Sequence, residues 1–154
     1  MMARGSLSWI LGIFLFTIAS WVAFKNVSSL IISLILFLLF VIGVILSIFF
    51  IVFFRDPDRT PTGDEDDAVS PADGKVISIQ KRTICIFMNI HDVHVNRAPL
   101  SGLVTHIDYK PGGYIPAFNK DSDVNERNKV VFNTAAGTLE LTQIAGVLTR
   151  RIVS

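Results

Sequence analysis

The hydrophobic pattern divides the chain at Phe54 into an apolar first third and a polar remainder. Residues 7–24 and 27–54 contain no charged side chain, and a short polar turn separates them. A helix needs about 20 apolar residues to cross a bilayer, and backbone in lipid must satisfy its own hydrogen bonds. A cleaved signal peptide is the alternative for the first stretch, but a second apolar stretch follows it instead of a small-residue cleavage site. The pattern therefore predicts that residues 1–54 are a membrane anchor formed by a hairpin of two transmembrane helices.

Beyond Phe54 the pattern changes to short strands and turns. Residues 55–67 are rich in Pro, Gly and acidic side chains, which predicts a linker. Runs of β-branched or alternating residues follow, separated by turn-forming clusters such as PADG, APLSG and KPGGY. These runs are KVISIQ, TICIFMNI, LVTHIDY, KVVFN, TLELTQIA and VLTRRIV. The expected fold class is mainly β (α+β), a single domain at residues 68–154 behind the helical hairpin.

Charge and cysteine content narrow the class of protein. The formal net charge is +1, and the polar part carries every acidic residue and nearly all the basic ones. Nucleic-acid binding needs a basic excess, so the composition disfavours a nucleic-acid partner and none is expected. The lone Cys85 cannot form an intrachain disulfide, and its apolar neighbours predict a buried strand residue.

Basic residues near the apolar stretches predict the orientation in the membrane. Arg4 precedes the first stretch, and Arg55 and Arg59 follow the second. Cytoplasmic flanks of membrane helices carry an excess of Lys and Arg, so both ends of the hairpin are expected in the cytoplasm. Lys25, in the turn, opposes this assignment. The polar domain is therefore expected on the cytoplasmic face of the cell membrane.

The stretch NIHDVHVNRAPLSG (89–102) contains two of the three histidines. The spacing of His91 and His94 does not suit one face of a helix, and in a strand the two rings would face opposite sides. A proline break follows, so we expect a loop that turns both rings towards a common cavity. Zinc binding lacks a recognisable set of further ligands, and two solvated histidines or an acid–base pair remain as alternatives.

An imidazole base needs a carboxylate to orient it. Asp92 is adjacent to His91, but its side chain would have to double back. Asp73, in VSPADGKV (69–76), sits in a Pro-then-Gly turn and could hold an imidazole through its ring N–H. An aspartate that caps the turn is the alternative for Asp73.

Four segments in the polar part occur in a recognisable order. They are SPADGKV, FMNIHDVHVNRAPLSG, KPGGYIPAFNKDSDVNERN and QIAGVLTRRIV. Behind a hydrophobic anchor, they resemble the phosphatidylserine decarboxylases, in the short subgroup that includes the archaetidylserine decarboxylases. The resemblance extends from FFRDPDR (53–59) to RRIVS (150–154) and implies a fold rich in β-strands.

The resemblance also implies an enzyme that makes its own cofactor. In this family a serine of a Gly-Ser motif attacks the preceding carbonyl, and the precursor splits into a β subunit and a small α subunit that begins with a pyruvoyl group. By motif position, His94 resembles the base that activates this serine, and Asp73 resembles the carboxylate that orients it. His91 resembles the residue that serves the decarboxylation step. The implied reaction is pyruvoyl-dependent decarboxylation of phosphatidylserine or archaetidylserine to the ethanolamine phospholipid.

Other polar residues in the matching segments are candidates for substrate binding. The Arg97 guanidinium suits a lipid phosphate, with a loop salt bridge as the alternative. Asn125 and Glu126, in DSDVNERN, resemble a motif near the active site, with a solvated loop as the alternative. The implied partners are a membrane phospholipid, the small pyruvoyl-bearing α subunit from the same precursor and, as an open alternative, a second copy of the chain.

The chain departs from the family pattern at the Gly-Ser motif. The motif lies beyond the RRIVS-like segment in the family, whereas Gly5-Ser6 precedes the first apolar stretch here. The pyruvoyl serine is therefore expected beyond Ser154, and residues 68–154 resemble a C-terminally incomplete β-subunit portion. The alternative function is a non-catalytic, membrane-anchored β-domain that binds lipid or protein, and a metal-dependent enzyme that uses both histidines is a third class.

Overall fold

The computed structural model describes residues 1–64, 66–115, 124–146 and 152–153. The chain forms two compact units. The helix unit comprises Met1–Asp58 together with Ile90–Val95, and the strand unit comprises Arg59–Asn89 and Asn96–Ser154. The segment with the two candidate histidines therefore belongs to the same unit as the apolar helices, although more than 30 residues separate them in the sequence.

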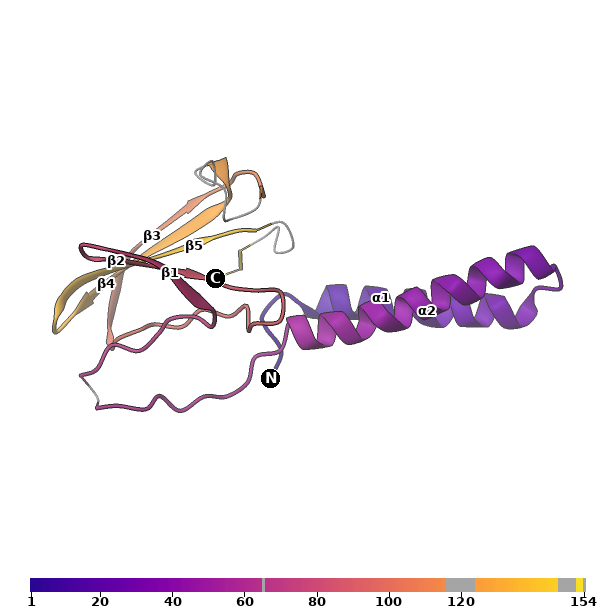
Figure 1. Cartoon of the computed structure of the whole chain (residues 1–154), viewed down its shortest axis with the longest axis horizontal. Coiled ribbons are helices and arrows are strands. Elements are labelled where there is room, and N and C mark those ends of the chain that lie inside the picture. Colours follow the sequence, from indigo (N-terminus) through magenta and orange to yellow (C-terminus); the bar gives the residue numbers. More distant parts are fainter. Residues whose placement is uncertain (65, 116–123, 147–151, 154) are drawn as a thin grey trace. The chain divides into compact units, whose positions relative to one another are not determined.

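The helix unit contains the two predicted helices, α1 (Leu7–Asn26) and α2 (Leu30–Phe53), which run antiparallel side by side (Figure 1). The second helix begins three residues later than predicted, because Val27 and Ser29 have extended backbone. Both helices are long and apolar enough to cross a membrane, and only 11% of the most apolar window of each is buried. The two helices are thus confirmed, and their insertion in a bilayer stays a prediction.

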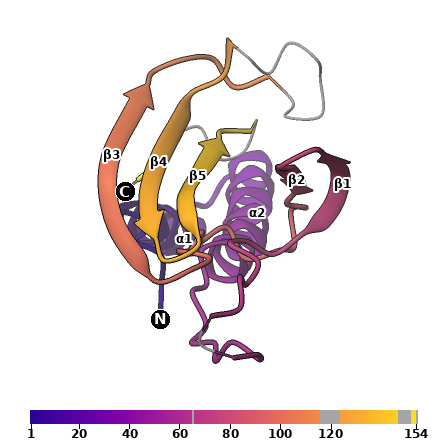
Figure 2. The same ribbon diagram turned by 90° about the vertical axis from the view of Figure 1, so that its left-hand side faces the viewer.

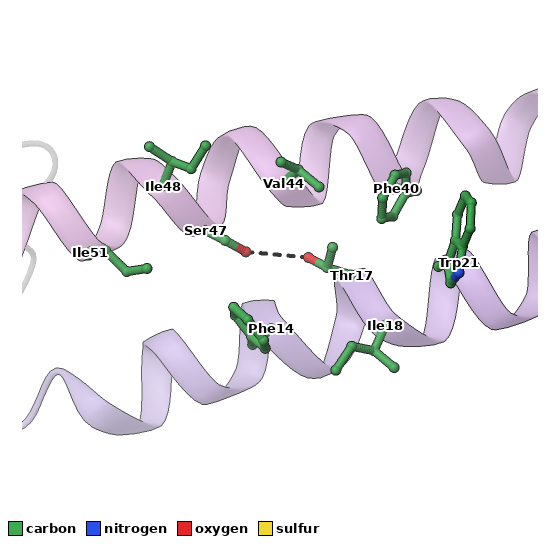
Figure 3. A pocket seen from close by; sticks show the side chains of 9 residues that line it. All are labelled: Phe14, Thr17, Ile18, Trp21, Phe40, Val44, Ser47, Ile48 and Ile51. Atoms are coloured by element: carbon green, nitrogen blue, oxygen red, sulfur yellow. Dashed lines mark hydrogen bonds between the residues drawn. The ribbon is translucent and has the colours of Figure 1, made fainter.

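The hydroxyl side chains of Thr17 and Ser47 face each other between the two helices (Figure 3). Thr17 on α1 lies 3.4 Å from Ser47 on α2, oxygen to oxygen, and both side chains are buried. A Cβ on Gly43 would come within 2.5 Å of the Thr17 hydroxyl oxygen, so glycine permits the close approach. Beside this contact lies an apolar cavity of about 360 Å³ between α1 and α2, lined by Phe14, Ile18, Trp21, Phe40, Val44, Ile48 and Ile51.

The strand unit contains two antiparallel sheets. Strands β1 (Lys75–Gln80) and β2 (Thr83–Phe87) form a hairpin. Strands β3 (Gly102–Lys110), β4 (Arg127–Thr134) and β5 (Gly137–Ile144) form a second sheet with β4 in the middle (Figure 2). The expected mainly β (α+β) class behind two apolar helices is confirmed.

Several details differ from the sequence-based expectations. Strand β2 ends at Phe87, three residues before the predicted end of TICIFMNI, and the chain turns at Ile90. Cys85 is exposed, so its predicted burial was wrong; most residues of the β1–β2 hairpin are exposed on both faces. The last predicted strand, VLTRRIV, lies largely outside the described residues, and Ile152 and Val153 have no strand structure.

The best-buried residues of the strand unit gather on β4 and beside it. Phe132 and Asn128 on β4 are 7% and 4% exposed, and Ala145, directly after β5, is 1% exposed. Asn125 and Glu126, which precede β4, are also buried. The buried region therefore includes polar side chains, which need hydrogen-bond partners inside the protein.

Candidate functional site

The six candidate site residues are divided between the two units. His91 and His94 lie in the helix unit, in the segment Ile90–Val95, which consists of a turn and irregular backbone as expected. The other four, Asp73, Arg97, Asn125 and Glu126, lie in the strand unit.

The His94 ring stacks on the ring of Phe53, the last residue of α2. The two ring centroids are 4.1 Å apart and the ring planes differ by 26°. The ring nitrogen Nδ1 of His94 lies 2.9 Å from the carbonyl oxygen of Asp92. A carbonyl can only accept, so this bond requires a proton on Nδ1 and leaves the lone pair on Nε2.

The protonation of His94 follows from its surroundings. Burial of the ring lowers the pKa of His94 below its ordinary value, and the hydrogen bond to the Asp92 carbonyl opposes this effect. The positive charge of Arg55 contributes a further, smaller lowering of the same pKa. His94 is therefore a neutral imidazole at pH 7, with Nε2 able to accept a proton.

His91 has a different environment, three residues away. Its side chain is 76% exposed, and its Nε2 lies 3.7 Å from the carboxylate oxygen Oδ1 of Asp92. Its backbone carbonyl accepts a hydrogen bond of 2.7 Å from the Arg55 guanidinium. The carboxylate of Asp92 thus does approach a histidine, but it approaches His91, whereas His94 uses the main-chain carbonyl of the same residue.

In the strand unit, Asp73 lies in the turn before β1. Both of its carboxylate oxygens accept from the Arg59 guanidinium, and the bond from Nη2 to Oδ2 is 2.6 Å long. This interaction raises the pKa of Arg59. The next residue, Gly74, has φ of +135°, and a Cβ there would collide with the Phe87 carbonyl, so the turn requires glycine.

The pairing of Asp73 with His94 stays a prediction. In the structure the ring N–H of His94 is directed to the Asp92 carbonyl, and Asp73 is held by Arg59. From the sequence, Arg59 entered only the prediction of membrane orientation, as a basic residue after the second apolar stretch. Its position in FFRDPDR, where the family resemblance begins, was the signal that could have marked it.

Arg97 is placed beside the Asp73 turn by the backbone. The Arg97 N–H donates to the Pro71 carbonyl at 2.8 Å, and the Val69 N–H donates to the Pro99 carbonyl at 2.9 Å. These bonds hold two of the family-like segments, SPADGKV and the NRAP part of the histidine motif, next to each other. The Arg97 residue itself is exposed.

Asn125 and Glu126 contact backbone groups. The Asn125 side-chain oxygen accepts from the Ile115 N–H, and its amide nitrogen donates to the carbonyls of Ile115 and Ala145. The Glu126 carboxylate accepts from the Ile152 N–H at 2.7 Å. These contacts tie the loop before β4 to the residue after β5 and to residue 152; a role in substrate binding stays a prediction for both.

The sequence assigns no role to the GGY segment or to His106. Gly113 exchanges backbone hydrogen bonds with Val124 and Glu126, so the GGY segment packs against the protein's own backbone. His106 is an exposed residue of β3. Among the residues that the structure describes, no three His, Cys, Asp or Glu side chains come close enough together to bind a metal ion.

Comparison with known proteins identifies relatives along the whole chain. The sequence model of the family described as phosphatidylserine decarboxylase matches residues 46–154. A putative archaetidylserine decarboxylase proenzyme of Methanococcoides burtonii is 46% identical over 155 residues, which cover 100% of this chain and 72% of the relative. A protein of the same description from Methanosarcina mazei is 46% identical over 156 residues, or 73% of its length. A phosphatidylserine decarboxylase proenzyme of Streptomyces avermitilis is 51% identical over 106 residues, which cover 66% of this chain and 48% of the relative.

Proposed function

Because the chain belongs to the phosphatidylserine decarboxylase family, we propose that it acts on phosphatidylserine or archaetidylserine and converts the serine headgroup to ethanolamine. The proposal includes self-processing, since the relatives are described as proenzymes. The cofactor proposed is a pyruvoyl group made from a serine beyond Ser154, and when present it supplies an electron sink for decarboxylation. The observation that carries the proposal is the setting of His94, whose ring stacks on Phe53 and whose Nδ1 lies 2.9 Å from the Asp92 carbonyl oxygen.

His94 is proposed as the base for self-processing. A serine hydroxyl is a weak nucleophile and needs a neighbouring base to accept its proton. His94 suits this role because burial lowers its pKa and because the Asp92 carbonyl keeps the proton on Nδ1, which leaves Nε2 as the acceptor. Asp73 is proposed to stabilise the imidazolium that forms when Nε2 takes the proton.

His91 is proposed to serve the decarboxylation step. Its exposed ring can exchange protons with solvent, and its Nε2 lies 3.7 Å from the Asp92 carboxylate. A protonated imidazole can return a proton to the carbon that loses carbon dioxide. The two histidines thus differ in burial and in their contact with Asp92, which suits one to accept a proton and the other to donate one.

Arg97 is proposed to bind the lipid phosphate, because its guanidinium can offer two parallel hydrogen bonds to phosphate oxygens. Its backbone is fixed next to the Asp73 turn. Asn125 and Glu126 are proposed to shape the same region through the backbone groups they hold. The proposed location is the cytoplasmic face of the cell membrane, and the proposed protein partner is the small α subunit from the same precursor.

The test separates the two histidines. A fusion is made in which a family C-terminal segment with its Gly-Ser motif follows Ser154, and splitting is read from fragment masses. We expect His94→Ala to slow splitting by about 10²- to 10⁴-fold, the usual contribution of a general base, and Asp73→Asn to impair it. His91→Ala should split normally and then release carbon dioxide from the aminophospholipid slowly.

The control is His106→Ala, which removes the exposed histidine of β3 and should change neither reaction. Normal splitting of the His94→Ala fusion would show that His94 is not the base. Equal loss of splitting in the His91 and His94 variants would contradict the division of roles. Inhibition by chelators together with bound zinc would instead favour the metal-dependent class.

A further inference from the structure

We propose that the C-terminal end of α2 is part of the active-site scaffold: Phe53 and Arg55 hold the histidine segment in place at the depth where this helix leaves the membrane. The proposal rests on the roles given above to His91 and His94. It makes Phe53 and Arg55 positioning residues, which act through the histidines and not on the lipid.

The first observation is the burial of Phe53. The buried residues of α2 are Gly43, Ser47 and Phe53. Gly43 and Ser47 face Thr17 on α1, so helix packing accounts for their burial. Phe53 is 3% exposed, and its ring stacks on His94. A phenylalanine at the end of a lipid-exposed helix is therefore buried against the histidine segment.

The second observation is the Arg55 guanidinium, which joins the helix to the same segment. Its Nη1 donates to the Val52 carbonyl at 2.7 Å, and its Nη2 donates to the His91 carbonyl at 2.7 Å. Carbonyls in the last turn of a helix lack an intrahelical partner, and a cation there also interacts favourably with the helix dipole. The Arg55 side chain thus donates both to a carbonyl in the last turn of α2 and to the backbone carbonyl of His91.

The backbone on both sides of Arg55 is itself held. The Phe54 carbonyl accepts from the Ala3 N–H at 2.9 Å, and the Asp56 N–H donates to the Met1 carbonyl at 2.8 Å. Met2 and Arg55 form an antiparallel bridge between these two bonds. The N-terminal residues therefore restrain the segment from which Arg55 reaches the histidines.

The position along α2 has a consequence for the substrate. The apolar stretch ends at Phe54, and Arg55 is the first charged residue after it. Aromatic and arginine side chains at such a boundary lie at the level of the lipid headgroups. Histidines attached there would meet a lipid headgroup while the lipid tails stay in the bilayer. The helix would then set the height of the catalytic groups as well as tether the protein.

The experiment measures the His94 ring directly in the full chain, in detergent micelles, by nuclear magnetic resonance of labelled histidine. Protons over the face of another ring are shielded, so Phe53→Leu should move the His94 ring signals downfield. It should also raise the pKa of His94 towards its ordinary value, because the ring becomes less buried. Phe53→Tyr, which keeps a ring, should retain the wild-type signals.

Phe37→Leu is the matched control, since Phe37 lies on the same helix and its ring contacts Phe24 and Phe40. It should leave the His94 signals unchanged. If Phe53→Leu also leaves them unchanged, the positioning proposal is wrong, whatever role His94 has. If the signals move but the His94→Ala fusion splits normally, the positioning stands and the assignment of His94 as base fails.

Arg55 provides a second variant that does not disturb the apolar packing. In the fusion protein, Arg55→Met should lower kcat for carbon dioxide release by about 10²-fold, the effect expected for a misplacement of about 1 Å, with little change in KM. Arg55→Lys, which keeps one donor and the charge, should recover part of the loss. Equal kcat values for wild type and Arg55→Met would contradict the proposed role of Arg55.

Discussion

The protein's own backbone provides hydrogen-bond partners for both polar atoms of the Asn125 side chain. Asn125 is 2% exposed, and its amide makes three hydrogen bonds, to Ile115 N–H, Ile115 carbonyl and Ala145 carbonyl. Backbone N–H and C=O groups in a loop have no neighbouring strand to pair with, and here the Asn125 side chain supplies their hydrogen-bond partners. The Asn125 amide therefore links Ile115, which precedes β4, to Ala145, which follows β5, beside the backbone hydrogen bonds of Gly113 and Glu126.

We predict that Asn125→Ala destabilises the strand unit. Removing the amide leaves buried backbone groups without partners, and each such group costs about 1–3 kcal/mol. Asn133→Ala, at an exposed position of β4, is the matched control and should change the stability by less than about 0.5 kcal/mol. Denaturant unfolding followed by circular dichroism measures both, and equal midpoints for the two variants would contradict this account of Asn125.

At the scale of elements, the contact between α1 and α2 depends on close approach at one point. Gly43 faces Thr17, and the Thr17 and Ser47 hydroxyls meet beside it. In lipid the hydrophobic effect does not drive helices together, so packing of small residues and polar contacts carries their association. The aromatic contact of Trp21 with Phe40, at 4.9 Å between ring centroids, extends the same interface.

We predict that Gly43→Val weakens the helical hairpin. The added side chain would meet the Thr17 hydroxyl, and overpacking of this kind costs about 1–3 kcal/mol. Gly12→Val on α1 is the control, because a Cβ on Gly12 would meet nothing within 4 Å. Unfolding in mixed micelles with increasing dodecyl sulfate should occur earlier for Gly43→Val only. Similar midpoints for both variants would show that the approach at Gly43 is not needed.

At the scale of the whole molecule, a hairpin of two membrane-spanning helices would return the chain to the side of the membrane on which it began. Arg4 and Arg55 flank the hairpin on that side, whereas Lys25 lies at its turn. The positive-inside tendency therefore favours a cytoplasmic strand unit. The histidine segment belongs to the helix unit, so in a membrane-inserted hairpin the orientation would also decide which leaflet the histidines face.

We predict that reporter proteins fused after Lys25 and after Arg59 lie on opposite sides of the membrane, with the second in the cytoplasm. The reason is that α2 lies between the two fusion points and is long enough to span the bilayer once. Paired alkaline phosphatase and fluorescent-protein fusions would report the two locations. If both reporters lie on the same side, the transmembrane hairpin is ruled out. If the reporter after Lys25 is in the cytoplasm and the reporter after Arg59 is outside, the cytoplasmic orientation is contradicted.

The sequence by itself determined the two helices, three of the strands (β1, β3 and β5) to within one residue at each end, and the family. Apolar runs and alternation are local patterns, and strands such as Lys75–Gln80 follow from them because each residue's burial depends on its neighbours in the chain. Cys85 is where this inference failed: its apolar neighbours indicated burial, but both faces of its hairpin are largely exposed. The family motifs also marked His91 and His94 as candidate site residues.

Only the tertiary structure decided how those histidines are held. The Arg55 side chain reaches a residue 36 positions away, and Phe53 meets His94 across a similar separation. No periodic pattern records such a contact, because it depends on how the chain returns to the end of α2. The same holds for the two hydrogen bonds from the Arg59 guanidinium to the Asp73 carboxylate and for the hydrogen-bond partners of Asn125. Helices and strands could be predicted from the order of residues, whereas burial, contact partners and protonation depended on residues that come together only in the folded chain.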